Sequence, residues 1–489
     1  MREREWAAFW RAPERSSTCH RPFRAAALPR SAASNTDTAR WYLQNFDAVD
    51  HIFVGEGESQ IVDIYHGLVS GEAPLDGVSG LCSRGPDGVT TNGVAVARDL
   101  DLLPPPDFDD FMAGFEGADK SAVQLPALAS RDCNWRRCRF CAFLSQAGAG
   151  QFRHLSAGRF ADILEGYVRR YGVSRFQFHD NNFAFSRSFL RDLAGRITQK
   201  GYSFSCSART PLMDDELAGI LAEAGAETVC LGVESMSQGL LDRMQKGTRI
   251  LDNIRAIKAV VKHDIHLLVA LLGDIPNETR REIEEYESNL ALIEDVFFVP
   301  YLRGTLELNL NRVLFQYGSA YVEDAASHGL EVEPSTFART FVPTELRSMP
   351  LYYIAASYRH RGSARKIRSF IQSLERRASL VTKEKALEVA RSALRTIDPS
   401  AELLRGSMLL SWGYSDGDYI VIEDRRDYVQ KRYVLDGSDR PVFLDLLRHT
   451  PLDRIYEVHG EEVAGPVIEL LVKHRVIFTD HGSVVSAFA

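Results

Sequence analysis

Residues Cys133–Cys141 read CNWRRCRFC and place three cysteines in a C-x4-C-x2-C spacing, directly after the apolar segment Val123–Ala129. Three thiolates on one short loop indicate a metal site. A [4Fe-4S] cluster is usually held by four thiolates, so three cysteines leave one iron open to another ligand. A structural zinc site with His154 as its fourth ligand is the alternative. The spacing alone leaves both interpretations open.

The composition is that of an ordinary globular protein. The chain has 489 residues, 45% of them hydrophobic and 25% charged, enough for about two to four domains. Its formal net charge of −8 argues against a general nucleic-acid binder, which needs basic surface. We expect no membrane span, because no apolar stretch is long enough. Seven cysteines do not form a paired disulfide framework, and an iron-sulfur site needs a reducing compartment, so we expect a cytoplasmic protein.

The N-terminal part divides into two segments. Residues 1–40 contain eight arginines and show no sustained period, so we expect a poorly ordered N-terminus, with a targeting peptide as the alternative. Residues 41–118 begin with the strand Val49–Val54 and an amphipathic helix over Ile61–Leu68, which together predict one β/α unit of a parallel sheet. A hairpin over Gly80–Val94 and the proline-rich linker Leu103–Phe108 follow.

Strand and helix patterns alternate over residues 119–330. Ser156 and Ser186 are in position to cap two of the helices. Six β/α units are expected, and this number predicts an α/β fold with a partial (β/α)6 barrel. The six strands are expected at Val123–Ala129, Val173–Phe178, Tyr202–Ser207, Thr228–Val233, Ile265–Leu272 and Val296–Val299.

Polar groups follow five of these strands. Parallel barrels carry their chemistry at the carboxyl ends of the strands, so the shared position predicts a common active-site edge. Each residue alone could equally be a helix cap or a turn former. The groups are the cysteine loop, Asp180–Asn182, Arg209, Glu234–Ser235 and Gly273–Glu278.

The alternating pattern stops beyond about Ser335. Residues 331–400 predict a helical extension, with helices at Met349–Tyr358, Ile367–Leu374 and Lys383–Leu394. Residues 401–489 predict an α+β winged-helix-like module with a terminal hairpin, a unit that in an acidic chain more often binds protein or peptide than DNA.

The chain from about Phe46 to Gly318 resembles the cobalamin-binding radical S-adenosylmethionine (SAM) enzymes, in particular the subgroup that matures ribosomal peptide natural products (RiPPs). The first gap between cysteines is one residue longer than is usual in that superfamily. The matching segments are the cysteine loop, Phe53–Glu58 (FVGEGE), Pro104–Phe108 (PPPDF), Arg175–Phe183 (RFQFHDNNF), Ser205–Arg209 (SCSAR), Gly232–Ser235 (GVES) and Pro276–Thr279 (PNET).

The resemblance implies a site and its cofactors. Cys133, Cys138 and Cys141 would hold a [4Fe-4S] cluster, and SAM would bind its open iron. The residues that would contact SAM are Phe140, Asn181, Asn182, Arg209, Glu234, Ser235, Gly273 and Glu278. A guanidinium suits the SAM carboxylate and a carboxylate suits the ribose hydroxyls.

The resemblance also implies an activity. The expected reaction cleaves SAM to a 5′-deoxyadenosyl radical that modifies an unactivated carbon, as in C-methylation of a peptide precursor with cobalamin. A truncated Rossmann-like segment at the N-terminus would be the remnant of the cobalamin domain, so a SAM-only radical modification is an alternative. An inactive homologue that acts as a peptide-binding scaffold is another. The expected partners are the peptide precursor and a reductant such as flavodoxin or ferredoxin, without nucleic acid or membrane.

Overall fold

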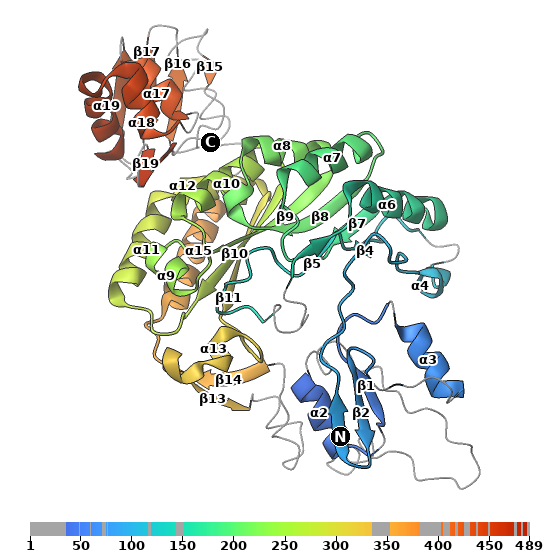
Figure 1. The fold of residues 1–489 in the computed structure, drawn as a ribbon. Coiled ribbons are helices and arrows are strands. Elements are labelled where there is room, and N and C mark those ends of the chain that lie inside the picture. Colours follow the sequence, from blue (N-terminus) through green and yellow to red (C-terminus); the bar gives the residue numbers. More distant parts are fainter. Residues whose placement is uncertain are drawn as a thin grey trace. The chain divides into compact units, whose positions relative to one another are not determined.

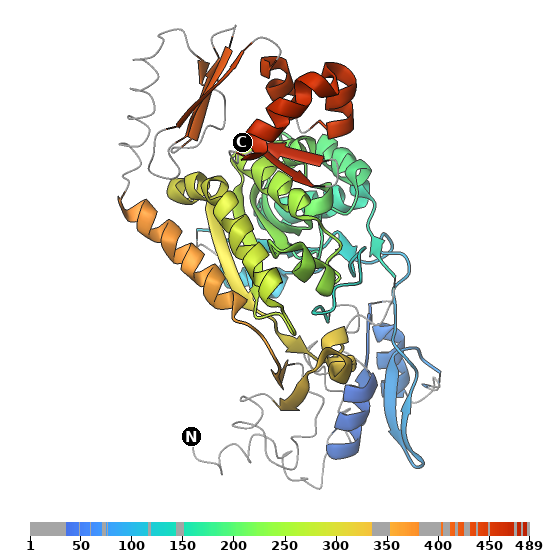
Figure 2. The same ribbon diagram turned by 90° about the vertical axis from the view of Figure 1, so that its left-hand side faces the viewer.

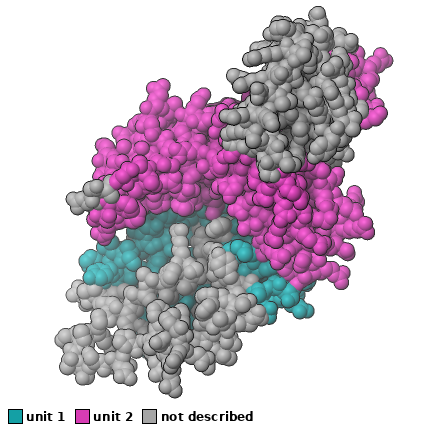
Figure 3. Space-filling model, turned by 180° about the vertical axis from the view of Figure 1, so that it is seen from behind, with its two compact units in different colours: residues 1–106, 131–155, 314–357 teal, residues 107–130, 156–313, 358–489 magenta. Residues whose placement is uncertain are grey.

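A computed structural model describes most of the chain from Thr36 onward and divides it into two compact units. Unit 1 comprises residues 1–106, 131–155 and 314–357, and unit 2 comprises residues 107–130, 156–313 and 358–489 (Figure 3). The described residues are 36–47, 49–58, 60–70, 75, 77–115, 119–142, 151–334, 353–380, 402–403, 411–415, 419–424, 431–436, 439–447, 450–473, 477–480 and 483–486.

Unit 2 is built around a six-stranded parallel sheet with the order β11-β10-β9-β8-β7-β4. The predicted partial barrel is therefore confirmed, and the sheet is open between its outer strands β4 and β11. Its strands are β4 (Leu125–Ala127), β7 (Arg175–Phe178), β8 (Ser203–Ala208), β9 (Ala226–Glu234), β10 (His266–Gly273) and β11 (Leu306–Arg312).

Helices connect these strands and line the outer side of the sheet (Figure 1). The predicted caps are confirmed: Ser156 accepts a hydrogen bond from Arg159 N, and Ser186 accepts one from Phe189 N. The connecting helices are α6 (Ala157–Tyr171), α7 (Arg187–Ile197), the 3-10 helix η1 (Thr210–Leu212), α8 (Asp215–Glu223), α9 (Gln238–Arg243), α10 (Ile250–Lys262), α11 (Arg280–Leu292) and α12 (Glu294–Arg303).

Aromatic rings fill the core between α6 and the first strands. Phe178 on β7 stacks on Phe204 of β8 with ring centroids 4.6 Å apart, and it lies 4.8 Å from Phe183. Phe160 on α6 meets the same ring from the helix side at 5.1 Å. Rings of this size bury a large apolar area, so this cluster fixes α6 against the sheet.

The sixth strand was predicted in the wrong place. Residues 296–299 lie in helix α12, and the strand that pairs with β10 is β11, seven residues long. The apolar run Val296–Val299 is too short for its periodicity to distinguish a strand from a helix. Leu306, Leu308 and Leu310, in contrast, alternate with polar residues as a strand requires.

The first described element of unit 1 is helix α2 (Thr36–Asn45), so residues 36–40 are helical and not poorly ordered as expected. The rest of the expected N-terminal segment lies outside the described residues. Strand β1 (His51–Phe53) and helix α3 (Ile61–Ser70) form the predicted β/α pair, and β2 (Leu81–Gly85) and β3 (Gly88–Thr91) form the predicted hairpin. β1 pairs antiparallel with β2. Among the described residues this sheet holds β1, β2 and β3 alone, so the parallel strands of a Rossmann-like segment are not seen there.

Two further small sheets contain residues of unit 1. One joins β5 (Ser130–Arg131) to β6 (Arg153–His154), at the two ends of the segment that carries the cysteines. The other is antiparallel with the order β12-β14-β13, and the short helices α13 (Ala320–Glu323) and η2 (Ala325–His328) lie between its first two strands in sequence. Its strands are β12 (Phe315–Gln316), β13 (Glu331–Pro334) and β14 (Tyr353–Ser357).

The prediction for residues 331–400 was right only in its middle part. β13 and β14 are strands, so the predicted helix Met349–Tyr358 is wrong over 353–357, where a short apolar run pairs into a sheet. Helix α15 (Ser363–Leu380) covers the predicted helix Ile367–Leu374 and packs along α11, α12 and β11 (Figure 2). The predicted helix Lys383–Leu394 lies outside the described residues.

In its described residues, the C-terminal module combines an antiparallel sheet of the order β15-β16-β17-β18, three helices and the predicted hairpin. Its apolar core includes Phe443, Ile455 and Leu471, one from each helix. Helix α18 was not predicted. The elements are β15 (Glu402–Leu403), β16 (Ser411–Ser415), β17 (Tyr419–Asp424), β18 (Lys431–Asp436), α17 (Asp439–Leu447), α18 (Leu452–His459), α19 (Glu461–Lys473), β19 (Ile477–Asp480) and β20 (Ser483–Ser486).

One short helix, α4 (Asp109–Ala113), precedes β4. In the part of the chain that the structure describes, no helix is long and apolar enough to cross a membrane.

Candidate functional site

Polar residues follow the carboxyl ends of β7, β8, β9 and β10 in unit 2, as predicted. Asn182 and Arg209 are joined directly: the Arg209 amide donates to Asn182 Oδ1 at 2.9 Å. The Arg209 guanidinium donates through Nη2 to the carbonyl of Lys246 at 2.5 Å. Arg209 is thus held through both its backbone and its side chain, and these contacts fix the position of its positive charge at the end of β8.

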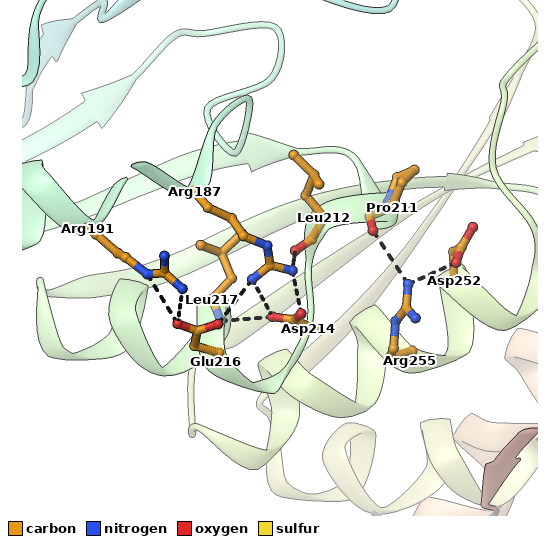
Figure 4. A network of polar contacts seen from close by, with 9 residues as sticks. All are labelled: Arg187, Arg191, Pro211, Leu212, Asp214, Glu216, Leu217, Asp252 and Arg255. Carbon is orange, nitrogen blue, oxygen red and sulfur yellow. Dashed lines mark hydrogen bonds and ion pairs between the residues drawn. The ribbon is translucent and has the colours of Figure 1, made fainter. Parts of the chain in front are cut away.

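The turn that carries Arg209 away from the sheet is fixed by arginines of neighbouring helices (Figure 4). Arg187 of α7 donates to the Leu212 carbonyl at 3.2 Å and pairs with Asp214, the N-cap of α8. Arg255 of α10 reaches the Pro211 carbonyl at 3.5 Å and forms an ion pair with Asp252 at 2.9 Å. Because the Pro211 and Leu212 carbonyls of η1 both have side-chain donors, the position of Arg209 does not depend on its own contacts alone.

Glu234 ends β9 in an unusual backbone conformation. Its φ is +61°, and the pairing of β9 with β10 slips by one residue between Gly232 and Glu234. A bulge of this kind re-aims a side chain at a strand end. Positive φ is uncommon for a residue with a Cβ and is often found at functional positions.

The Glu234 carboxylate forms a buried ion pair with Lys246, whose Nζ lies 2.7 Å from Oε1. A Cβ on Gly232 would lie 2.8 Å from that Nζ, so the glycine makes room for the pair. The sequence prediction missed Lys246, because it lies in the connection between α9 and α10 rather than at a strand end. Both neighbours of Lys246 have positive φ, +52° at Gln245 and +66° at Gly247, and the glycine is a sign of this turn in the sequence.

Ser235 is fully buried, and its polar atoms have structural partners. Its hydroxyl oxygen accepts from Ser237 N at 3.0 Å, and its carbonyl accepts from the side chain of Asn253 at 3.1 Å. These bonds stabilise the turn after β9. Its contact with SAM stays a prediction, as do those of Asn181, Asn182, Arg209 and Glu234.

Asp180 is a buried acid at the end of β7. It accepts from the Ser130 hydroxyl at 2.5 Å and from Ala129 N at 3.2 Å, so it ties β7 to the residues just before the cysteine loop. Burial is the main cause that raises the pKa of this carboxyl to about 6, although the hydrogen bonds oppose the change. Near neutral pH the Asp180 carboxylate is therefore ionised although burial disfavours its charge.

Gly273 and Glu278 have partners in the chain itself. A Cβ on Gly273 would lie 2.5 Å from Ala364 Cα, so the glycine allows the first turn of α15 to approach β10. The Glu278 carboxylate accepts from Arg361 N at 2.6 Å and from both the amide (3.1 Å) and the hydroxyl (2.5 Å) of Ser363. Asp274 accepts from Ala364 N at 3.2 Å. These two acids cap α15, a structural role that the prediction of cofactor contacts for Gly273 and Glu278 did not foresee.

The cysteine loop follows β4 and β5 in the chain and belongs to unit 1. Cys133, Cys138 and Cys141 are half-buried and are not in disulfides, and a turn closes between Cys141 N and the Cys138 carbonyl at 3.1 Å. Phe140 is half-buried within the same turn, and its expected place along the adenine stays a prediction.

The described cysteines fall into two groups that differ in their surroundings and in their suitability as metal ligands. Burial raises the pKa of the Cys82, Cys206 and Cys230 thiols, as is typical of inert structural cysteines. The three thiols of the cysteine loop share one short segment and fit a cluster with one iron open to SAM. His154, the candidate fourth zinc ligand, is exposed on β6, with its Nδ1 2.7 Å from the Leu155 carbonyl.

A parallel partial barrel, polar residues after its strands and a three-thiol loop after the first strand together define a class of iron-sulfur barrel enzymes. Residues 128–288 match the family model described as the radical SAM superfamily. Such a match implies a [4Fe-4S] cluster and SAM, and the cysteines fit the cluster. This match favours the cluster over zinc.

Two curated proteins are similar to parts of the chain. The chain is 28% identical over 253 residues to a protein of Pyrococcus horikoshii described as an uncharacterized methyltransferase, covering 51% of this chain and 54% of the relative. It is 23% identical over 289 residues to the anaerobic magnesium-protoporphyrin IX monomethyl ester cyclase of Synechocystis sp., covering 56% and 54%. The chain thus spans about half the length of these curated relatives.

A solved structure with the same fold is that of the cobalamin-dependent SAM radical enzyme OxsB with aqua-cobalamin and SAM bound. The TM-score is 0.51 at 18% identity, covering 65% of this chain and 49% of that chain. At this identity the likeness supports the fold alone.

Proposed function

We propose that the chain is a radical SAM enzyme that modifies an unactivated carbon, by C-methylation of a ribosomal peptide precursor. The observation that carries the radical SAM part is the loop of three half-buried cysteines, none of them in a disulfide, within the matched residues 128–288. When bound, the cluster supplies the electron that splits SAM into methionine and a 5′-deoxyadenosyl radical, which takes a hydrogen atom from the substrate.

In this proposal, the residues of the chain bind SAM and orient it. Arg209 is a cation fixed by Asn182 and Lys246, and it suits the carboxylate of SAM. Glu234, turned by the bulge of β9, suits the ribose hydroxyls, while Lys246 supplies the opposite charge beside it in a buried place. Exclusion of water by the barrel protects the radical.

Methyl transfer is supported by the Pyrococcus relative. Cobalamin is supported by the motifs shared with the cobalamin-binding enzymes and by the fold shared with OxsB, a cobalamin-dependent enzyme. The peptide substrate rests on the motif resemblance, and the C-terminal module offers three helices and a hairpin for docking it. The antiparallel pairing of β1 favours a second candidate, a SAM-only radical modification, because a corrin needs the wider parallel sheet.

The test begins with protein purified without oxygen and supplied with SAM and a reductant, from which 5′-deoxyadenosine should form. The protein should be brown and absorb near roughly 400 nm as thiolate-ligated iron does, whereas a zinc protein is colourless. Cys138→Ala should abolish colour and SAM cleavage together, while Cys230→Ala, a half-buried cysteine on β9, should keep both. A fully reconstituted cluster without 5′-deoxyadenosine would refute the enzymatic proposal.

The substrate is tested separately by mass spectrometry of a co-expressed peptide precursor, with and without cobalamin. Methylation adds the mass of one methylene and requires cobalamin. A change that is independent of cobalamin would favour the second candidate. An unchanged mass is the result expected of a scaffold.

A further inference from the structure

A buried ion network in unit 1 joins the segment FVGEGE to both ends of the cysteine loop. Glu56 accepts two parallel hydrogen bonds from Arg153, at 2.6 and 2.8 Å. Glu56 also accepts from Ala97 N at 2.7 Å, and Arg153 donates to the Ala97 carbonyl at 2.5 Å. Glu56 and Arg153 are 8% and 9% exposed, so the pair is almost removed from water.

The network reaches the residue that precedes the first cysteine. Arg153 Nη2 lies 3.3 Å from Asp132 Oδ2, and Asp132 is buried with φ +68°. This backbone conformation is uncommon for a residue with a side chain and persists only where the surroundings hold it. Arg153 follows the loop and Asp132 precedes it, so one guanidinium joins the two ends of the loop to Glu56.

A second pair lies beside the first and is more exposed. Arg131 Nη2 forms an ion pair with Glu58 Oε1 at 2.6 Å, and Arg131 Nη1 lies 3.1 Å from Glu56. The Glu58 side chain is 38% exposed against 8% for that of Glu56. Glu58 therefore offers a matched control that shares the partner Arg131 and lies in a more solvated environment.

Stability alone does not explain buried charges here. The cost of removing two ions from water offsets most of their attraction, and apolar residues of similar size would stabilise as well or better. A bidentate arginine–carboxylate pair instead fixes the relative orientation of the two side chains, because its two hydrogen bonds fix the planes of both groups. What this pair orients is the base of the segment that carries the three thiols.

We infer that Glu56 and Arg153 are positioning residues, which hold the two ends of the cysteine loop so that its three thiols converge for cluster capture. The inference rests on the proposed function in its assignment of the cluster. It concerns only residues of unit 1, and it adds a role for FVGEGE that does not involve contact with SAM or substrate.

The test compares Glu56→Gln, which keeps the shape but removes the charge, with Glu58→Gln as the control. In the apoprotein, amide hydrogen exchange over 131–142 and 151–155 should speed up at least about tenfold in Glu56→Gln and less than about twofold in Glu58→Gln. Exchange in β7, β8 and β9 of unit 2 should not change, which shows that the variant folds.

Iron retention and the spectrum of the cluster are the second measurement. After reconstitution and gel filtration, Glu56→Gln should lose most of its iron, and the change that SAM makes in the electron paramagnetic resonance signal should weaken in what remains. Glu56→Asp, which keeps the charge, should restore part of both. Equal exchange and iron in Glu56→Gln and wild type would overturn the inference, as would faster exchange spread equally over unit 2.

These readouts separate the inference from the proposed function. A wild-type protein that holds iron and forms no 5′-deoxyadenosine would refute the enzymatic proposal and leave the exchange and iron results valid. A wild-type protein that cleaves SAM while Glu56→Gln keeps its iron and its loop exchange would refute the positioning role alone.

Discussion

Replacement of Lys246 by Met removes the cation from the buried ion pair at the end of β9. The pair is 2.7 Å long, and its Lys246 and Glu234 side chains are 7% and 10% exposed. Met fills most of the lysine stem, so little packing is lost, but the Glu234 carboxylate is left buried without its partner. Breaking such a pair from one side costs about 3–5 kcal/mol of unfolding free energy. We expect a value near the lower limit, because Glu234 is not fully enclosed.

Lys262→Met is the matched control. Lys262 of α10 forms an ion pair with Asp215 of nearly the same length, 2.8 Å, but the two side chains are 50% and 58% exposed. An exposed pair contributes about 0–1 kcal/mol. The two variants therefore remove the same type of cation from pairs of similar length, and the main difference between the pairs is their burial.

The measurement is hydrogen exchange of peptides that cover β8 and β9, supported by urea unfolding followed by circular dichroism. Local exchange is preferred because a chain of two units need not unfold in one step. The double variant Lys246→Met with Glu234→Gln should recover part of the loss, since the uncompensated charge is gone. A loss in Lys246→Met no larger than that in Lys262→Met would refute the reasoning.

Two further predictions concern the strand ends of unit 2. The raised pKa of Asp180, about 6 against 3.8 in a solvated aspartate, means that the folded state holds its proton more tightly, so stability should fall as pH rises from about 4 to about 7. The full difference corresponds to about 3 kcal/mol, and Asp180→Asn should flatten the pH dependence of urea unfolding of the apoprotein; an unchanged slope would contradict it. Gly273→Ala should destabilise by about 1–3 kcal/mol, because the added Cβ meets backbone atoms of Ala364 that cannot move without α15. Gly166→Ala in α6, where a Cβ meets nothing within 4 Å, should instead be neutral or stabilising. Thermal unfolding of the two variants measures both effects, and equal losses would disprove the steric argument.

Most of the fold was predictable from local sequence patterns. The helix starts at Ser156 and Ser186 were predictable because a cap and its periodic apolar face lie within one short window. The buried strand β10 was predictable from its length and apolar run. The sixth strand was missed because a short apolar segment that belongs to α12 has the composition of a strand.

Partners distant in the sequence were not predictable. The sequence around His51–Phe53 does not indicate that β1 pairs with the hairpin that follows it and not with a parallel strand. The contacts of Gly273 and Glu278 with SAM stay predictions, and their observed partners lie on α15, more than eighty residues along the chain. Lys246 was missed for the same reason: its significance comes from Glu234, which the fold brings to it.

The backbone of the cysteine loop has one fixed point that comes from much later in the chain: the Tyr321 amide donates to the Arg139 carbonyl at 3.1 Å. A ribosome that has just completed the barrel strand β11 has not yet made this residue. While it is still being translated, the nascent chain therefore has all three thiols but lacks that anchor. The loop can therefore complete its backbone contacts only after residue 321 has been synthesised.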